Sequence, residues 1–302
     1  IFKTLIRRQE RDIHMLKAFK KVLLPIIVTF LPLSQIFADT SVDSMLSGLS
    51  LPEKIGQMIL VYNSPRDFLE KHSVGGILLM QDMLKKPSEL KKELQDKQAR
   101  LKIPLLITID QEGGTVNRIK YLPKWADAPS AQEMRNWPED SIHTIQKKIA
   151  DELRELKVNC NLAPVLDPTE NHTGEMTYIA RKNRTFGTAT DEIVRPSRAF
   201  IRAFSDNNIG CIVKHFPGYD VTVNSDFKIA ISEADSVQMS RNINPFRELL
   251  GTYSGIMMSS ILYEKINNVP AVFSPDIVAI ARKITPDGII MTDDLWGVAL
   301  RS

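Results

Sequence analysis

Lys214 and His215 are adjacent basic residues that directly follow the short apolar run 211–213. The run reads as a buried strand, and residues 216–218, Phe-Pro-Gly, end it because proline cannot donate to a ladder and glycine frees the backbone to turn. A polar loop that carries Asp226 comes next. Cations at a strand end beside an acidic loop are typical of a site for a hydroxyl-rich ligand. Strands also end in charged residues for structural reasons, so this stretch alone does not decide.

The same pattern recurs, since three other apolar runs end in carboxylates: Asp110, Asp167 and Asp293, the last followed by Asp294. Two glycines after Asp110 allow a tight turn that leaves Arg118 free to point back at the strand end. A purely structural ion pair between Arg118 and Asp110 is the alternative. The recurrence favours a polar site assembled from several strand ends.

Short apolar segments alternate with segments of helical periodicity along most of the chain. The predicted strands are residues 55–62, 75–80, 104–110, 158–167, the run from 211, 255–263 and 288–293. The predicted helices are residues 87–100, 141–156, 192–208, 242–250 and 274–284. Continuously apolar strands between amphipathic helices predict a parallel sheet that is buried on both faces.

Chemistry-bearing side chains at the ends of many strands predict an α/β fold of the TIM-type (β/α) barrel class, whose active site lies at that end. A doubly wound sheet would gather its ligand groups at one switch point instead. No Gly-rich phosphate motif follows the first strand. Arg184, on the long loop after Asp167, joins the candidate site because loops of this length are usually functional or disordered. Seven strands precede Ser302, so we expect a barrel that is either truncated after the seventh strand or open.

The composition is that of an ordinary globular protein, with 43% hydrophobic and 25% charged residues. Residues 1–38 contain seven basic and two acidic residues, a net charge of +5 within a total of +3, which leaves −2 for the remainder. An acidic body gives no reason to expect nucleic-acid binding. Cys160 and Cys211 lie in apolar runs and are predicted to be buried free thiols. No metal-ligand spacing is present and no cofactor is expected.

The segment from Met15 has the layout of a secretory signal peptide. Three lysines precede an apolar stretch over residues 22–33, and small-residue cleavage is predicted near Ala38. An uncleaved membrane anchor is the alternative, which the shortness of the stretch and its prolines weaken. We therefore expect a leader over residues 1–38, a barrel domain over residues 39–302, and export to the periplasm or medium of a bacterium. No stable membrane insertion is expected after cleavage.

Five ordered motifs together resemble glycoside hydrolase family 3, most closely its single-domain β-N-acetylglucosaminidase branch. They are IDQEGGTVNR (109–118), LAPVLD (162–167), RTFG (184–187), KHFPG (214–218) and MTDDL (291–295). The resemblance implies a carbohydrate substrate, with Asp293 as the nucleophile of a retaining glycosidase. It also implies the residues that hold the substrate: Asp110, Arg118, Arg184, Lys214 and His215.

The loop after KHFPG departs from this branch, which carries Asp-Ser-His there with the histidine as general acid/base. Counting from Lys214, that position holds Phe227, which cannot move a proton. Asp226 is the candidate replacement. Lys228, the other candidate after a one-residue shift, has an ordinary pKa of about 10.4 and is a poor general acid near neutral pH.

Three functions remain open from the sequence. The first is an exo-glycosidase that removes terminal β-linked N-acetylglucosamine, for example from cell-wall fragments. The second is a non-catalytic sugar-binding relative that has lost its acid/base. The third is an aldolase-like barrel with Lys214 as a Schiff base.

Overall fold

The computed structural model describes residues 42–301, which fall into two compact units, residues 42–58 and 59–301. The predicted upstream residues and signal peptide, together residues 1–38, lie outside the described residues. In the first unit, Ser50 caps the N-terminus of helix α2 (Leu51–Gln57). Its side chain accepts a hydrogen bond from the backbone N–H of Glu53. The prediction of a strand from residue 55 is therefore wrong for residues 55–57, because this capped helix runs through them.

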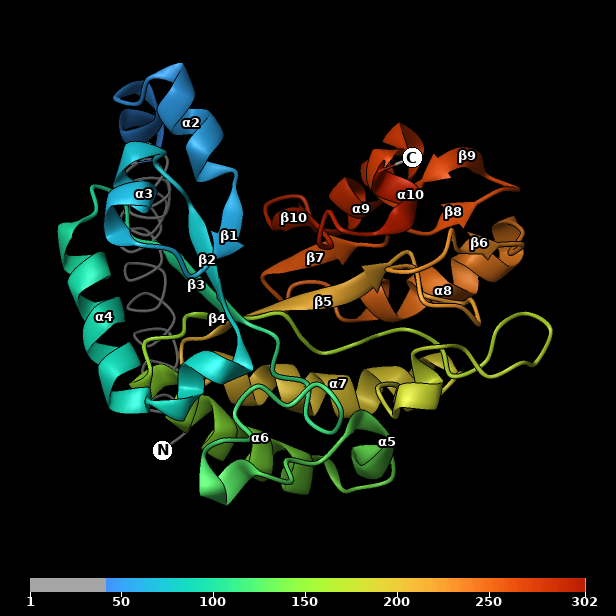
Figure 1. The fold of residues 1–302 in the computed structure, drawn as a ribbon. Helices are drawn as coiled ribbons and strands as arrows, with labels where there is room; N and C mark the ends of the chain where they lie inside the picture. The colour runs from blue at the N-terminus through green and yellow to red at the C-terminus, as the bar shows by residue number, and fades with distance from the viewer. Residues whose placement is uncertain (1–41, 302) are drawn as a thin grey trace, which may run out of the picture. The chain divides into compact units, whose positions relative to one another are not determined.

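A seven-stranded parallel sheet forms the centre of the second unit (Figure 1). Its strands in spatial order are β1 (Leu60–Tyr62), β2 (Gly76–Leu79), β3 (Leu106–Ile109), β4 (Cys160–Asn161), β5 (Gly210–Phe216), β7 (Gly255–Met258) and β10 (Ile289–Thr292). Each strand lies beside the one that precedes it in this sheet, and all six pairings are parallel. This is the topology of a TIM-type (β/α) barrel, and the predicted fold class is confirmed.

Helices occupy most of the connections between these strands. They are α3 (Arg66–Lys71), α4 (Pro87–Arg100), α5 (Ala131–Met134), α6 (Glu139–Glu155), α7 (Thr190–Ser205), α8 (Ser236–Glu248) and α9 (Pro275–Ile284); α10 (Val298–Arg301) follows β10. Helix α7 packs against β5, with α6 and α8 as its neighbours (Figure 1). The five predicted helices are confirmed, although α8 begins six residues before the predicted start at residue 242. Asp235 causes the earlier start, because its side chain accepts hydrogen bonds from the backbone of Val237 and Gln238.

Two predicted strands were too long. Of residues 158–167 only β4 pairs regularly, because Pro164 has no N–H to donate, and Val165 forms one isolated bridge with Lys214. Residues 255–263 divide between β7 and the short strand β8 (Leu262–Tyr263). Strand β8 pairs with β6 (Ile231–Ser232) and β9 (Asn267–Pro270) in a separate three-stranded sheet.

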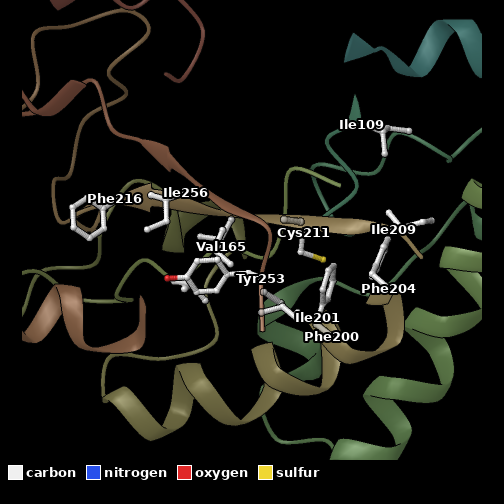
Figure 2. Packing of buried hydrophobic residues seen from close by; sticks show 14 of the residues in the cluster. Ile109, Val165, Phe200, Ile201, Phe204, Ile209, Cys211, Phe216, Tyr253 and Ile256 are labelled. Carbon is white, nitrogen blue, oxygen red and sulfur yellow. The ribbon is translucent and has the colours of Figure 1, made fainter. Parts of the chain in front are cut away.

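The central strands β2, β3, β4, β5 and β7 are buried on both faces, as predicted, whereas the edge strands β1 and β10 are partly exposed. Cys211 and Val213 belong to the large core between sheet and helices, whereas Ile212 packs with Cys160 and Met257 in a smaller core. Figure 2 shows aromatic side chains of α7 directed at the first residues of β5. Two of them, Phe200 and Phe204, stack with ring centroids 4.9 Å apart. This alternation of faces is why the strands read as continuous apolar runs.

Cys160 and Cys211 are free and buried, as predicted. They belong to different cores and so lie on opposite faces of the sheet. Burial raises the pKa of the Cys160 thiol to about 12. Neither thiol is therefore poised to react at neutral pH. Within residues 42–301, no helix is both long enough and apolar enough to cross a membrane.

Candidate active site

A buried cluster of two carboxylates and two cations lies at the C-terminal ends of the central strands. Lys214, in β5, contacts the carboxylate of Asp110, which directly follows β3. The Lys214 Nζ atom also lies 2.7 Å from Glu112 Oε1. Arg184 donates two hydrogen bonds to Glu112, at 2.8 Å from Nε and 2.9 Å from Nη2. Residues about 100 positions apart in the sequence thus belong to one cluster of ion pairs.

The ion pairs fix the charge states within this cluster. Burial alone would raise the pKa of Glu112, but Arg184 and Lys214 outweigh it and lower the pKa to about 2. Burial alone would lower the pKa of Lys214, but Asp110 and Glu112 raise it. A Schiff-base lysine needs a lowered pKa, so the cluster argues against the aldolase-like function. Charged donors and acceptors in a shielded site are well suited to holding sugar hydroxyls.

The turn after β3 brings Arg118 back to the same strand end. Gly113 and Gly114 have φ values of +94° and +55°, and a Cβ atom on Gly113 would lie 2.0 Å from the carbonyl oxygen of Pro129. The Gln111 side chain accepts a hydrogen bond from the backbone N–H of Arg118 at 2.8 Å. The guanidinium of Arg118 then lies 3.5 Å from Asp110 Oδ2. The glycines therefore have the role that the sequence predicted for them.

His215 is held by Asp167 rather than by the charged cluster. Asp167 is fully buried, and its Oδ2 atom lies 2.6 Å from His215 Nδ1. Its Oδ1 accepts hydrogen bonds from the backbone N–H groups of His215, at 2.9 Å, and of Tyr219, at 2.8 Å. The other imidazole nitrogen, Nε2, is left facing the candidate nucleophile.

Asp293 follows β10, and its Oδ2 lies 4.0 Å from His215 Nε2. Its backbone N–H bonds to the carbonyl of Met258 in β7, so the sheet register sets its position. Burial, and then the charge of Asp293, raise the pKa of the neighbouring Asp294. Asp293 is the better candidate nucleophile of the two, because the sheet register places it and its carboxylate faces His215.

Asp226 lies on the exposed loop after β5, close enough to this end of β10 that its charge also raises the pKa of Asp294. The backbone carbonyl of Ser225 accepts a hydrogen bond from Val298 at 3.3 Å, which joins the loop to the segment after the candidate nucleophile. Phe227, where the family branch has its histidine, is 78% exposed. Asp226 is thus placed beside the site, whereas Phe227 offers no proton.

Two residues that matter to this geometry were not among the predicted site residues, Glu112 and Asp167. Glu112 lies in a polar turn next to two glycines, and nothing local indicates that it is buried. Asp167 ends its apolar run in the same way as Asp110 and Asp293, and that signal was present in the sequence.

Other possible binding features do not coincide with this cluster. Among the described residues, no group of three or more His, Cys, Asp or Glu side chains is arranged to hold a metal ion. A hollow of about 440 Å³ is lined by Gly114, Thr115, Ser130, Gln132, Glu133 and Asn183. Its lining includes none of the cluster's charged residues, so we identify the site from its charges rather than from this hollow.

Comparison with known proteins points to one family. The family model of the glycosyl hydrolase family 3 N terminal domain matches residues 50–300. A β-hexosaminidase of Idiomarina loihiensis is 27% identical over 241 residues, covering 76% of this chain and 70% of the relative. One of Mannheimia succiniciproducens is 29% identical over 254 residues, covering 80% and 70%.

A solved structure shows the same fold. The glycoside hydrolase family 3 β-N-acetylglucosaminidase of Paenibacillus sp. str. FPU-7 superposes with a TM-score of 0.75 and 26% sequence identity. The match covers 84% of this chain but only 51% of that protein, so the chain spans about half of its length.

Proposed function

Because the chain belongs to the glycosyl hydrolase family 3 N-terminal domain family, we propose that it is a retaining exo-glycosidase that removes terminal β-linked N-acetylglucosamine from cell-wall or related glycans. The names of the relatives support the reaction class and the sugar. The observation that carries the proposal is the Asp293 carboxylate, 4.0 Å from an imidazole that is itself fixed by a buried aspartate.

Each residue then has a defined part in the reaction. Asp110, Arg118, Arg184 and Lys214 bind the hydroxyls of the terminal sugar, with His215 beside them. The Asp293 carboxylate attacks the anomeric carbon while the bond to the leaving oxygen breaks and Asp226 gives that oxygen its proton. The ionised Asp226 then takes a proton from water, which attacks the anomeric carbon and releases Asp293.

The nucleophile is tested by Asp293→Asn, with Asp294→Asn as the matched control. We expect Asp293→Asn to abolish turnover without loss of folding, because the amide cannot form the glycosyl ester. Peptide mapping of a 2-fluoro-sugar adduct should find the label on Asp293. A label on Asp294, or full activity of Asp293→Asn, would refute the assignment.

The proton donor is tested by Asp226→Ala on two substrates. Without general acid help, hydrolysis of an N-acetylglucosamine disaccharide should fall by about 10²–10⁴-fold, whereas an activated aryl glycoside needs little protonation. Azide should restore the aryl reaction by attacking the glycosyl–enzyme intermediate. Equal losses of kcat/KM on both substrates would exclude Asp226 as the donor, because kcat/KM reports the step that breaks the glycosidic bond.

A sugar-binding protein without catalysis is the second candidate, and Phe227 at the expected histidine position favours it. In that case the wild type would bind N-acetylglucosamine in calorimetry but cleave neither substrate. Measurable turnover of the aryl glycoside by the wild type, lost in Asp293→Asn, would reject this function.

A further inference from the structure

The loop that leads from β5 to Asp226 folds around one side chain, Tyr219. The Tyr219 hydroxyl donates a hydrogen bond to the carbonyl of Val223 and accepts one from the N–H of Ser225, both at 2.8 Å. The backbone N–H of Tyr219 donates to Asp167 Oδ1 at 2.8 Å. Tyr219 is only 4% exposed. One residue therefore connects the start of the loop to the two positions that flank Asn224.

These contacts determine where the backbone of Asp226 lies. Ser225, the preceding residue, is held through its N–H by Tyr219 and through its carbonyl by Val298. The N–H of Asp226 donates to the Asn224 side chain at 3.0 Å. Since the Asp226 side chain is exposed, core packing does not place it, and this backbone framework must do so.

The buried tyrosine Tyr253 bonds to a different part of the fold, whereas Tyr263 donates to the carbonyl of Gly218, the residue before Tyr219. The hydroxyl of Tyr253 donates to the Phe246 carbonyl at 2.9 Å, on a segment that precedes β7. The Tyr219 hydroxyl, by contrast, both donates and accepts within the loop. Burial raises the pKa of Tyr219 to about 12, so its O–H remains a donor throughout the neutral range.

We propose that Tyr219 is a positioning residue that holds the loop so that Asp226 can reach the leaving oxygen of the substrate. This rests on the proposed function, because it takes Asp226 as the proton donor. The Tyr219 hydroxyl acts through the backbone of Val223 and Ser225, while the ring makes an edge contact with His215 that a phenylalanine would keep. The consequence is specific: its loss should impair protonation of the leaving group and spare attack by Asp293.

The experiment compares Tyr219→Phe with Tyr253→Phe, since each removes one buried hydroxyl and leaves the ring in place. For Tyr219→Phe, kcat/KM on the disaccharide, which reports the step that expels the leaving group, should fall by about tenfold or more, a part of the 10²–10⁴-fold that a general acid supplies. The kcat/KM on the aryl glycoside should change by less than about threefold, because that leaving group needs little protonation. Deuterium uptake by peptides spanning residues 220–228 should rise in Tyr219→Phe and not in Tyr253→Phe.

The two readouts separate the possible failures. Equal losses of kcat/KM on both substrates would mean a merely structural role, and unchanged deuterium uptake would mean that the hydroxyl does not hold the loop; either overturns the proposal. If Asp226→Ala shows the leaving-group dependence and Tyr219→Phe does not, only the role of Tyr219 is lost. A wild type that cleaves neither substrate would refute the proposed function and this role together.

Discussion

Glu112 is the carboxylate that forms ion pairs with both Arg184 and Lys214. It is buried and bonded to Arg184 and Lys214, so its negative charge compensates two cations that are themselves largely shielded from water. Asp110 is the only other carboxylate that contacts Lys214 within the described residues. Removing one partner of a buried pair leaves an uncompensated charge, which costs more than the pair itself contributes.

We expect Glu112→Gln to lower the free energy of unfolding at pH 7 by about 3 kcal/mol and to weaken substrate binding, because Lys214 and Arg184 lose their shared partner. The folded pKa of Glu112, about 2, lies below its ordinary value of 4.5. Its stabilising contribution is therefore present above pH 4.5 and is lost as the pH falls through about 2. Urea denaturation of both proteins between pH 7 and pH 2.5 measures the difference.

Glu248 is exposed, so Glu248→Gln serves as the control. Its free energy of unfolding should be close to that of the wild type at every pH. A gap between Glu112→Gln and the wild type that stays constant down to pH 2.5 would show that Glu112 carries no ion-pair stabilisation.

The residues at strand ends could be predicted from the sequence, whereas their partners could not. Asp110 and Lys214 follow apolar runs, a local signal, and parallel strands bring their ends to one face. Glu112 has no such signal, because its burial depends on Lys214, which is 102 positions away. Asp226 was identified only because the family histidine is replaced, and the structure shows it on the surface of its loop.

At the scale of elements, the close approach of β7 and β10 sets the position of Asp293. Gly255 begins β7 and pairs with Ile289 of β10. A Cβ atom on Gly255 would lie 2.4 Å from the carbonyl oxygen of Ile289, a backbone atom that cannot rotate away. The absence of a side chain at this position is thus what lets the two strands pair.

We expect Gly255→Ala to cost about 1–3 kcal/mol of stability through overpacking. The shift of β10 should lower kcat by about 10²-fold on aryl and disaccharide substrates alike, because Asp293 is misplaced before attack. Gly48→Ala is the control, since the nearest atoms to its added Cβ are at an ordinary 3.6 Å. Steady-state kinetics and thermal melts test both variants, and an unchanged kcat for Gly255→Ala would contradict the argument.

Helices were easier to predict than strands for a physical reason. Helix boundaries follow from local signals, as helix 87–100 illustrates: proline stands at its first position, where its missing N–H costs nothing. Strand pairing depends on distant partners, so an apolar run says little about where pairing stops. Residues 158–167 and 255–263 look continuous in sequence, yet proline in the first and a change of sheet in the second shorten them.

At the scale of the whole molecule, the sequence predicts export, which raises the question of whether the two cysteines could form a disulfide. In an oxidising compartment exposed thiols tend to pair, but Cys160 and Cys211 are buried on opposite faces of the sheet. Within the described residues the fold is therefore held by packing and ion pairs, without a disulfide.

We propose that the leader directs export and is removed near Ala38. Cell fractionation with N-terminal sequencing should find a mature chain that begins near Asp39 outside the cytoplasm. Leu24→Arg, which interrupts the apolar stretch, should retain the uncleaved chain inside. An intact N-terminus on cytoplasmic wild-type protein would contradict export.

Asp167 illustrates that a residue can be required for activity without taking part in the reaction. Its two oxygens bind three groups: the imidazole and the backbone N–H of His215, and the backbone N–H of Tyr219. Replacing it would release all three at once. In a survey that replaces each aspartate and scores activity alone, Asp167 would therefore appear as essential as the nucleophile, although its side chain is fully buried. Essentiality here measures how many other groups depend on a residue, and only a covalent adduct shows which residue forms the bond.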